Sequence, residues 1–167
     1  HTGGRYTRPQ ENTDATASLG LLYDEMYAGE GLKVMEVIEG GPLLNAKTKI
    51  EKGVVIEKID GETIAATMDW AKMLNRKDGK NVLLTLYNPA TKERWEEVIK
   101  PISQGQEQGL LYDRWVKNMR KQVEEMSGGK VGYVHVQGMN DGSFRTASGL
   151  IQVSRLLYLV ASALGED

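Results

Sequence analysis

The sequence has no cysteine among its 167 residues, which excludes disulfide bonds and thiolate metal sites. It also lacks a strong charge of either sign, because 21 basic and 23 acidic residues leave a net charge of -2. A chain of this charge offers no basic field for nucleic acid. The longest apolar run, residues 156–161, is far shorter than the ~20 residues that cross a bilayer. We therefore expect no nucleic-acid partner and no membrane insertion.

What is present is an ordinary globular mixture, with 40% hydrophobic and 26% charged residues. The length suits one full domain and part of another. Residues 3–18 are polar and predict a loop or linker. Apolar alternation and turn residues predict strands at 19–23, 32–38, 54–59, 62–64, 81–87, 94–99 and 131–136. Helical spacing and capping residues predict helices at 43–47, 68–76, 105–127 and 148–164.

Two local signals are the clearest. Asp60-Gly61 is a tight-turn pair between two short extended stretches. The long helix at 105–127 has apolar residues in steps of four, four, four and three, which describe one helix face: Leu111, Trp115, Met119, Val123 and Met126. The glycines that follow Ser127 are typical of a helix end.

Three motifs in this order resemble the PDZ fold in its bacterial protease form. Residues 18–21, Ser-Leu-Gly-Leu, are similar to the carboxylate-binding loop of that family. Residues 40–42, Gly-Gly-Pro, are similar to the step that opens the first helix. Residues 52–61, Lys-Gly-Val-Val-Ile-Glu-Lys-Ile-Asp-Gly, are similar to the pattern x-G-D-x-I-x-x-[IV]-[ND]-G. Val54 replaces the usual Asp, and residues 47–50 replace the common Ala-Gly-Leu, so ligand preference is expected to differ.

The resemblance implies an α+β fold: a small PDZ-like β-barrel or sandwich capped by two helices, followed by a helix–strand–helix piece of a peptidase core. An extended peptide would add a strand at the backbone of the carboxylate-binding loop and the strand after it. Gly20 would let successive N–H groups face a carboxylate. The expected peptide-binding residues are Leu19, Gly20, Leu21, Leu22, Trp70, Met73 and Leu74. Each apolar member of this set is equally compatible with a place in the hydrophobic core.

The flanking segments resemble tricorn-type peptidases, relatives of the carboxyl-terminal processing peptidases. Residues 1–6, His-Thr-Gly-Gly-Arg-Tyr, are similar to the family's S-H-T-G stretch, which makes His1 a candidate general base. Residues 129–139 are similar to the strand that opens the peptidase core. The resemblance thus divides the chain into 1–16, a linker at the end of a preceding peptidase segment; 17–102, the PDZ-like domain; and 103–167, a helical linker and the incomplete start of the core.

Catalysis by this chain alone is not expected. A nucleophilic serine needs a base, a group that orients the base and an oxyanion hole. No Gly-x-Ser-x-Gly elbow surrounds Ser143 or Ser148, so we interpret them as a loop serine and a helix cap. We expect no metal site, since the only two histidines, His1 and His135, lie far apart in the sequence, and no other cofactor. His135 is expected on the less buried face of a strand.

The resulting hypothesis is a peptide-binding module of a tricorn-like serine endopeptidase that binds substrate or a C-terminal peptide and gates proteolysis. The alternatives are a non-catalytic PDZ adaptor that assembles protein partners, and a rigid spacer with a closed groove. The expected partner is a peptide or unfolded-protein substrate, and an oligomer is compatible with the resemblance. The sequence does not fix the compartment, although the resemblance favours a bacterial envelope over the cytoplasm.

Overall fold

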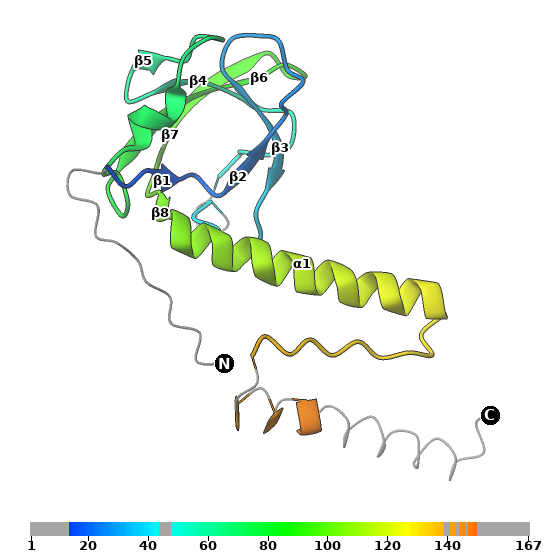
Figure 1. Cartoon of the computed structure of the whole chain (residues 1–167). Coiled ribbons are helices and arrows are strands. Elements are labelled where there is room, and N and C mark those ends of the chain that lie inside the picture. Colours follow the sequence, from blue (N-terminus) through cyan, green and yellow to red (C-terminus); the bar gives the residue numbers. More distant parts are fainter. Residues whose placement is uncertain (1–13, 44–47, 139–140, 143, 146, 150–167) are drawn as a thin grey trace. The chain divides into compact units, whose positions relative to one another are not determined.

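The computed structural model describes residues 14–43, 48–138, 141–142, 144–145 and 147–149 (Figure 1). The chain divides into two compact units between Tyr112 and Asp113, which are described separately below. Several expected features lie outside the described residues: the candidate base His1, most of the 1–16 linker, residues 44–47 of the first expected helix, Ser143, and nearly all of the 148–164 helix.

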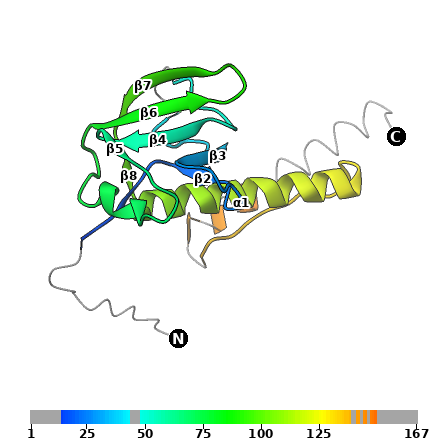
Figure 2. The same cartoon turned by 90° about the horizontal axis from the view of Figure 1, so that it is seen from above.

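The first unit is built on a six-stranded antiparallel sheet. Its strands are β2 (Leu21–Tyr23), β3 (Leu32–Val37), β4 (Val55–Ile59), β6 (Val82–Asn88) and β7 (Glu93–Ile99), in that order across the sheet, with β5 (Glu62–Thr63) paired to β4. Figure 2 shows this succession from β7 to β2. A separate ladder joins β1 (Ala17–Ser18) to β8 (Ile102–Ser103). The expected mixture of strands and helix is present, with open sheets.

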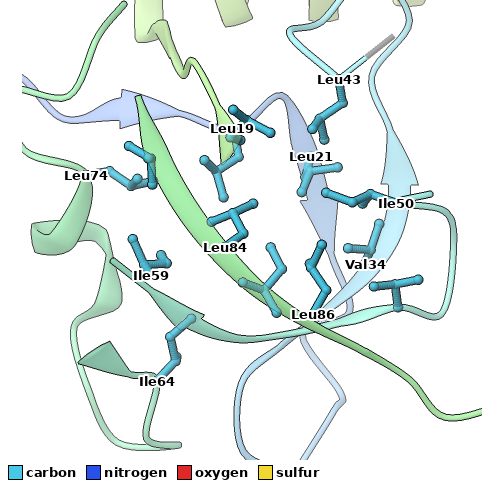
Figure 3. Packing of buried hydrophobic residues seen from close by; sticks show 14 of the residues in the cluster. Leu19, Leu21, Val34, Leu43, Ile50, Ile59, Ile64, Leu74, Leu84 and Leu86 are labelled. Carbon is cyan, nitrogen blue, oxygen red and sulfur yellow. The ribbon is translucent and has the colours of Figure 1, made fainter. Parts of the chain in front are cut away.

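Alternation along the strands explains how the core forms. In β6, the side chains of Val82, Leu84 and Leu86 are fully buried, whereas Leu83 and Thr85 between them are half-buried. Successive side chains of a strand point to opposite faces, so one face of β6 supplies the core. Buried side chains from β2, β3, β4 and the connecting loops join this cluster (Figure 3), and Ala17, Leu74 and Ile99 belong to it as well.

The predicted Asp60-Gly61 turn is present. Both residues have positive φ, 50° and 82°, as a two-residue hairpin turn of type I′ requires. The Asp60 carboxylate accepts hydrogen bonds from Lys77 Nζ at 2.7 Å and the Leu83 amide at 2.9 Å. The Lys77 hydrogen bond is the main reason that the pKa of Asp60 lies below its ordinary value. The hydrogen bond from the Leu83 amide therefore also links the turn after β4 to the start of β6.

The two expected capping helices are not confirmed. The segment predicted as a helix at 68–76 forms only the 3₁₀ helix η1 (Trp70–Leu74). Asn75 leaves helical geometry and pairs with Thr16 in an antiparallel bridge, and the Arg76 amide donates to the Ala15 carbonyl. These bonds to the N-terminal segment end the helix after Leu74. The first expected helix is described only at Leu43, which is a turn residue there.

The predicted helix at 105–127 is present as α1 (Gln104–Ser127), and Gly128 and Gly129 follow it with positive φ. Within the second unit, residues 131–136 were predicted to form a strand, and that prediction is wrong for the described structure, in which they belong to no strand. An extended segment becomes a strand only when its N–H and C=O groups find a partner strand. Among the described residues none pairs with this segment, so its valines stay exposed.

Candidate functional site

The two edges of the six-stranded sheet differ in chemistry. β7 has the charged, exposed side chains of Glu93, Arg94 and Glu96, which is how proteins prevent an edge from pairing with another chain. β2 at the opposite edge consists of Leu21, Leu22 and Tyr23. On one side β2 pairs with β3, and on its other side the described residues place no strand of this sheet. The β2 edge is therefore the one suited to accept an added strand.

The loop that leads into β2 has a fixed shape. Gly20 has φ +67°, and a Cβ atom placed there would lie 2.7 Å from Pro42 Cδ. The Gly20 amide donates to Ser18 Oγ at 2.9 Å, and the Gly20 carbonyl accepts from the Ile38 amide at 2.9 Å. Only glycine combines this backbone conformation with so close a neighbour. The Gly-Gly-Pro step thus packs directly on the loop that was expected to bind a carboxylate.

A carboxylate from the chain itself already lies at this loop. Ser18 Oγ and Glu107 Oε1 are 2.5 Å apart, and Glu107 lies in the first turn of α1. The helix begins here because Ser103 and Gln106 form a capping box: the Gln106 amide donates to Ser103 Oγ, and the Ser103 amide donates to Gln106 Oε1. Pairing of Ala17 with Ser103 holds this helix start beside the loop.

Two of the clefts that border β2 contain residues expected to bind a peptide and lie beside its edge or the loop before it. The larger, about 790 Å³, is lined mainly by apolar side chains, among them Leu22, Met35 and Trp70. The smaller, about 280 Å³, lies between residues 16–21, η1 and the start of α1, and Glu107 and Gln104 line it. Tyr23 and Trp70 line both, and their rings meet edge to face with centroids 5.0 Å apart. This aromatic contact connects β2 to η1 between the two clefts.

The Tyr23 hydroxyl has a shifted pKa because it is buried and lies near the negative charge of Glu107. Its pKa is raised well above the ordinary value for tyrosine, first by burial and second by the negative charge of Glu107. Both effects disfavour the phenolate form. A neutral phenol can serve as a hydrogen-bond donor or acceptor to a bound group.

The structure brings most of the expected peptide-binding residues together around these clefts, in two groups. Leu19, Leu21 and Leu74 are 1%, 3% and 1% exposed, so their side chains belong to the core and form the floor of the smaller cleft. Leu22 and Trp70 are half-buried and line the larger cleft. Gly20 shapes the loop. Met73 is half-buried against the core and lines neither cleft.

The sequence motif placed Ser18 in the expected carboxylate-binding loop, but nothing in the sequence pointed to Glu107 as the partner of its hydroxyl. The motif Ser103-x-x-Gln106 was visible as a capping box and would have placed the helix start. The two-residue pairing of β1 with β8 had no periodic signal, so nothing in the sequence connected that helix start with residue 18.

No three His, Cys, Asp or Glu side chains of the described residues gather where they could hold a metal ion. No helix within the described ranges has the length and apolar character needed to cross a membrane.

In the second unit His135 is half-buried against the ring edge of Trp115, and its Nδ1 lies 3.3 Å from the Tyr133 hydroxyl. The expectation that His135 is on the less buried face is wrong, because Val134 and Val136 beside it are exposed.

Comparison with known proteins gives a consistent set of relatives. No protein-family model matches the sequence. "Tricorn protease homolog 1" from Streptomyces coelicolor is 30% identical over 124 residues, which cover 74% of this chain and 11% of that protein. "Tricorn protease" from Thermoplasma acidophilum is 31% identical over 87 residues, 52% of this chain and 8% of that protein. The crystal structure of the tricorn protease matches with a TM-score of 0.64 at 23% identity, over 78% of this chain and 13% of that one.

Proposed function

We propose that this chain, which is related by sequence and fold to one segment of the tricorn-type proteases, carries a PDZ-like domain over residues 17–102 that binds an extended peptide at β2. The observation that carries the proposal is the apolar edge of β2 beside the 790 Å³ cleft, on which no strand from the described part of the chain is placed. A peptide added there would gain main-chain hydrogen bonds from the strand edge and apolar contacts from Leu22, Met35 and Trp70.

In the longer protein, the bound peptide would be a substrate, captured and delivered to a serine-type peptidase site. The chain spans about a tenth of the length of the relatives that it matches, so this wider role is a proposal from likeness. It assigns to His1 the part of general base and to residues 103–167 the approach to the catalytic core. Gating of proteolysis follows if peptide binding alters the start of α1, which borders the smaller cleft.

The contact between Tyr23 and Trp70 favours a second function, the rigid spacer. Rings 5.0 Å apart join β2 to η1 at the place where a peptide would lie between them. In the spacer, this contact stays closed and the domain only sets a distance between its flanking segments. The non-catalytic adaptor differs from both in the surrounding gene, since its reading frame would contain no downstream nucleophile in a peptidase core.

The test is a peptide-library screen on the 167-residue chain, followed by fluorescence polarisation with each selected peptide. We expect Leu22→Arg to weaken binding at least tenfold, because it places a charge in the apolar cleft beside the binding edge. Val98→Arg is the matched control, since Val98 is 59% exposed on β7 at the opposite edge of the sheet, and we expect unchanged affinity. Absence of any peptide ligand, for the wild type and for Trp70→Ala alike, would support the spacer instead.

A further inference from the structure

The carboxylate of Glu107 contacts the loop that the resemblance predicts should bind a peptide carboxylate. Ser18 Oγ accepts from the Gly20 amide on one side and meets Glu107 Oε1 at 2.5 Å on the other. A serine hydroxyl has a single proton, so Ser18 donates it to Glu107 while accepting from Gly20. The Ser18 hydroxyl therefore donates its only proton to a carboxylate of the same chain.

The charge around this carboxylate is one-sided. The described residues that line the smaller cleft include Glu107, Gln104, Ser18 and Tyr23 as polar groups, and no lysine or arginine is among them. The two cations closest in sequence to the lining residues of η1 are each paired with an aspartate: Lys72 with Asp69 at 3.3 Å, and Arg76 with Asp14 at 2.5 Å. The dipole at the start of α1 stabilises the Glu107 charge itself. A ligand group that enters the cleft therefore meets a negative charge without a lining cation to offset it.

We propose that Glu107 is a specificity-determining residue. It disfavours a free peptide C-terminus in the smaller cleft and favours an internal peptide segment or a basic side chain there. This inference rests on the proposed peptide-binding function and names the class of peptide. It departs from the expectation of a C-terminal peptide ligand, because the loop expected to bind a terminal carboxylate already contacts a group of like charge.

Coulomb's law sets the size of the effect. Two like charges ~5 Å apart reduce affinity by roughly fourfold under water-like screening and by roughly three-hundredfold under the screening typical near a protein surface. An expected discrimination of about tenfold lies within this range. Added salt weakens it, because the cleft is open to solvent and counterions screen exposed charges.

The experiment uses the hexapeptide Ser-Val-Thr-Val-Ala-Val, labelled with fluorescein at its N-terminus and made with either a free C-terminal carboxylate or a C-terminal amide. Two further amides end in lysine or in norleucine, which differ in charge at similar length. Fluorescence polarisation at pH 7 with the 167-residue chain gives the four affinities. We expect the first amide to bind about tenfold more tightly than the acid, and the lysine amide to bind more tightly than the norleucine amide.

Two substitutions identify the cause. Glu107→Gln keeps an oxygen acceptor for Ser18 and removes the charge, so the acid and the amide should then bind about equally. Glu107→Lys should reverse the preference in favour of the acid. Glu62→Gln, an exposed residue of β5 that lines neither cleft, changes the net charge by the same amount and should leave the wild-type ratio intact. Near-UV circular dichroism checks that each variant is folded.

The outcomes separate the two proposals. Equal binding of acid and amide by the wild type, or an unchanged ratio in both Glu107 variants, overturns the specificity role and leaves peptide binding intact. Failure of all four peptides and of every library peptide to bind any folded variant overturns peptide binding, and the specificity role with it.

Discussion

Gly20→Ala tests whether the close contact between the carboxylate-binding loop and the Gly-Gly-Pro step is as tight as the geometry indicates. Alanine at φ +67° costs about 1–2 kcal/mol for the left-handed backbone alone. Its Cβ would also lie 2.7 Å from Pro42 Cδ, and overpacking of this kind costs about 1–3 kcal/mol because a proline ring cannot rotate away. We expect a loss of roughly 2–5 kcal/mol in the free energy of unfolding.

Gly79→Ala is the matched control. Gly79 has the same φ of +67°, but no atom lies within 4 Å of the position that an alanine Cβ would occupy there, so only the backbone cost of about 1–2 kcal/mol applies. Urea unfolding followed by tryptophan fluorescence gives both values. Pro42→Ala in the Gly20→Ala background should recover the overpacking part, and a double-mutant cycle isolates it. Equal losses for Gly20→Ala and Gly79→Ala, with no coupling to position 42, would refute the steric reasoning.

Three further predictions concern stability. Glu97 accepts hydrogen bonds from Thr48 Oγ1, the Lys49 amide and Trp95 Nε1. Glu97→Gln should therefore lower the free energy of unfolding, measured in urea, by about 1–3 kcal/mol. Glu96 is exposed on the same strand, so Glu96→Gln should change that free energy by less than about 0.5 kcal/mol. Because Lys77 lowers the pKa of Asp60 in the folded protein, the ionised Asp60 carboxylate stabilises the fold above the unfolded pKa of about 3.9, and this stabilisation is lost as the pH falls through the lower folded pKa. Asp60→Asn should therefore flatten the acid side of a profile of unfolding free energy against pH, and an unchanged profile would contradict this. Ser103→Ala removes the capping box of α1 and should cost about 1 kcal/mol, measured by circular dichroism at 222 nm during unfolding; no loss would mean that the cap contributes nothing.

The elements with a clear period were predictable from sequence. β6 alternates buried and half-buried side chains over seven residues, and α1 repeats its apolar residues at helical spacing, so local chemistry alone identifies both. The Asp60-Gly61 turn was predictable for a similar reason, since few residue pairs adopt two positive φ angles.

The elements that depend on distant partners were not predictable. The helix expected at 68–76 is cut short by a bridge from Asn75 to Thr16, which are 59 positions apart. The segment 131–136 has the composition of a strand, but the described chain offers it no partner. A strand or a helix end that is decided by tertiary contact has no signature in its own residues.

The candidate site shows the same division. The loop at 18–21 and the apolar residues Leu22 and Trp70 were identified from their motifs, and the structure brings them to two adjoining clefts. Sequence reasoning assigned a binding role to Leu19, Leu21 and Leu74 together with these, although their side chains are core. It could not find Glu107, which reaches Ser18 across 89 positions through the short β1–β8 ladder.

The β1–β8 ladder has a consequence for the chain on either side of the domain. Ala17 pairs with Ser103, 86 positions later, so folding of the domain brings these two residues side by side. Holding together the ends of an unstructured loop of that length would cost about 4 kcal/mol of chain entropy. Because the domain closes this loop by its own folding, the chain enters the domain at Ala17 and leaves it at Ser103 at adjacent positions. A protein that contains this domain between two parts of another fold can therefore assemble those parts with little entropic penalty from the 85 residues that lie between Ala17 and Ser103.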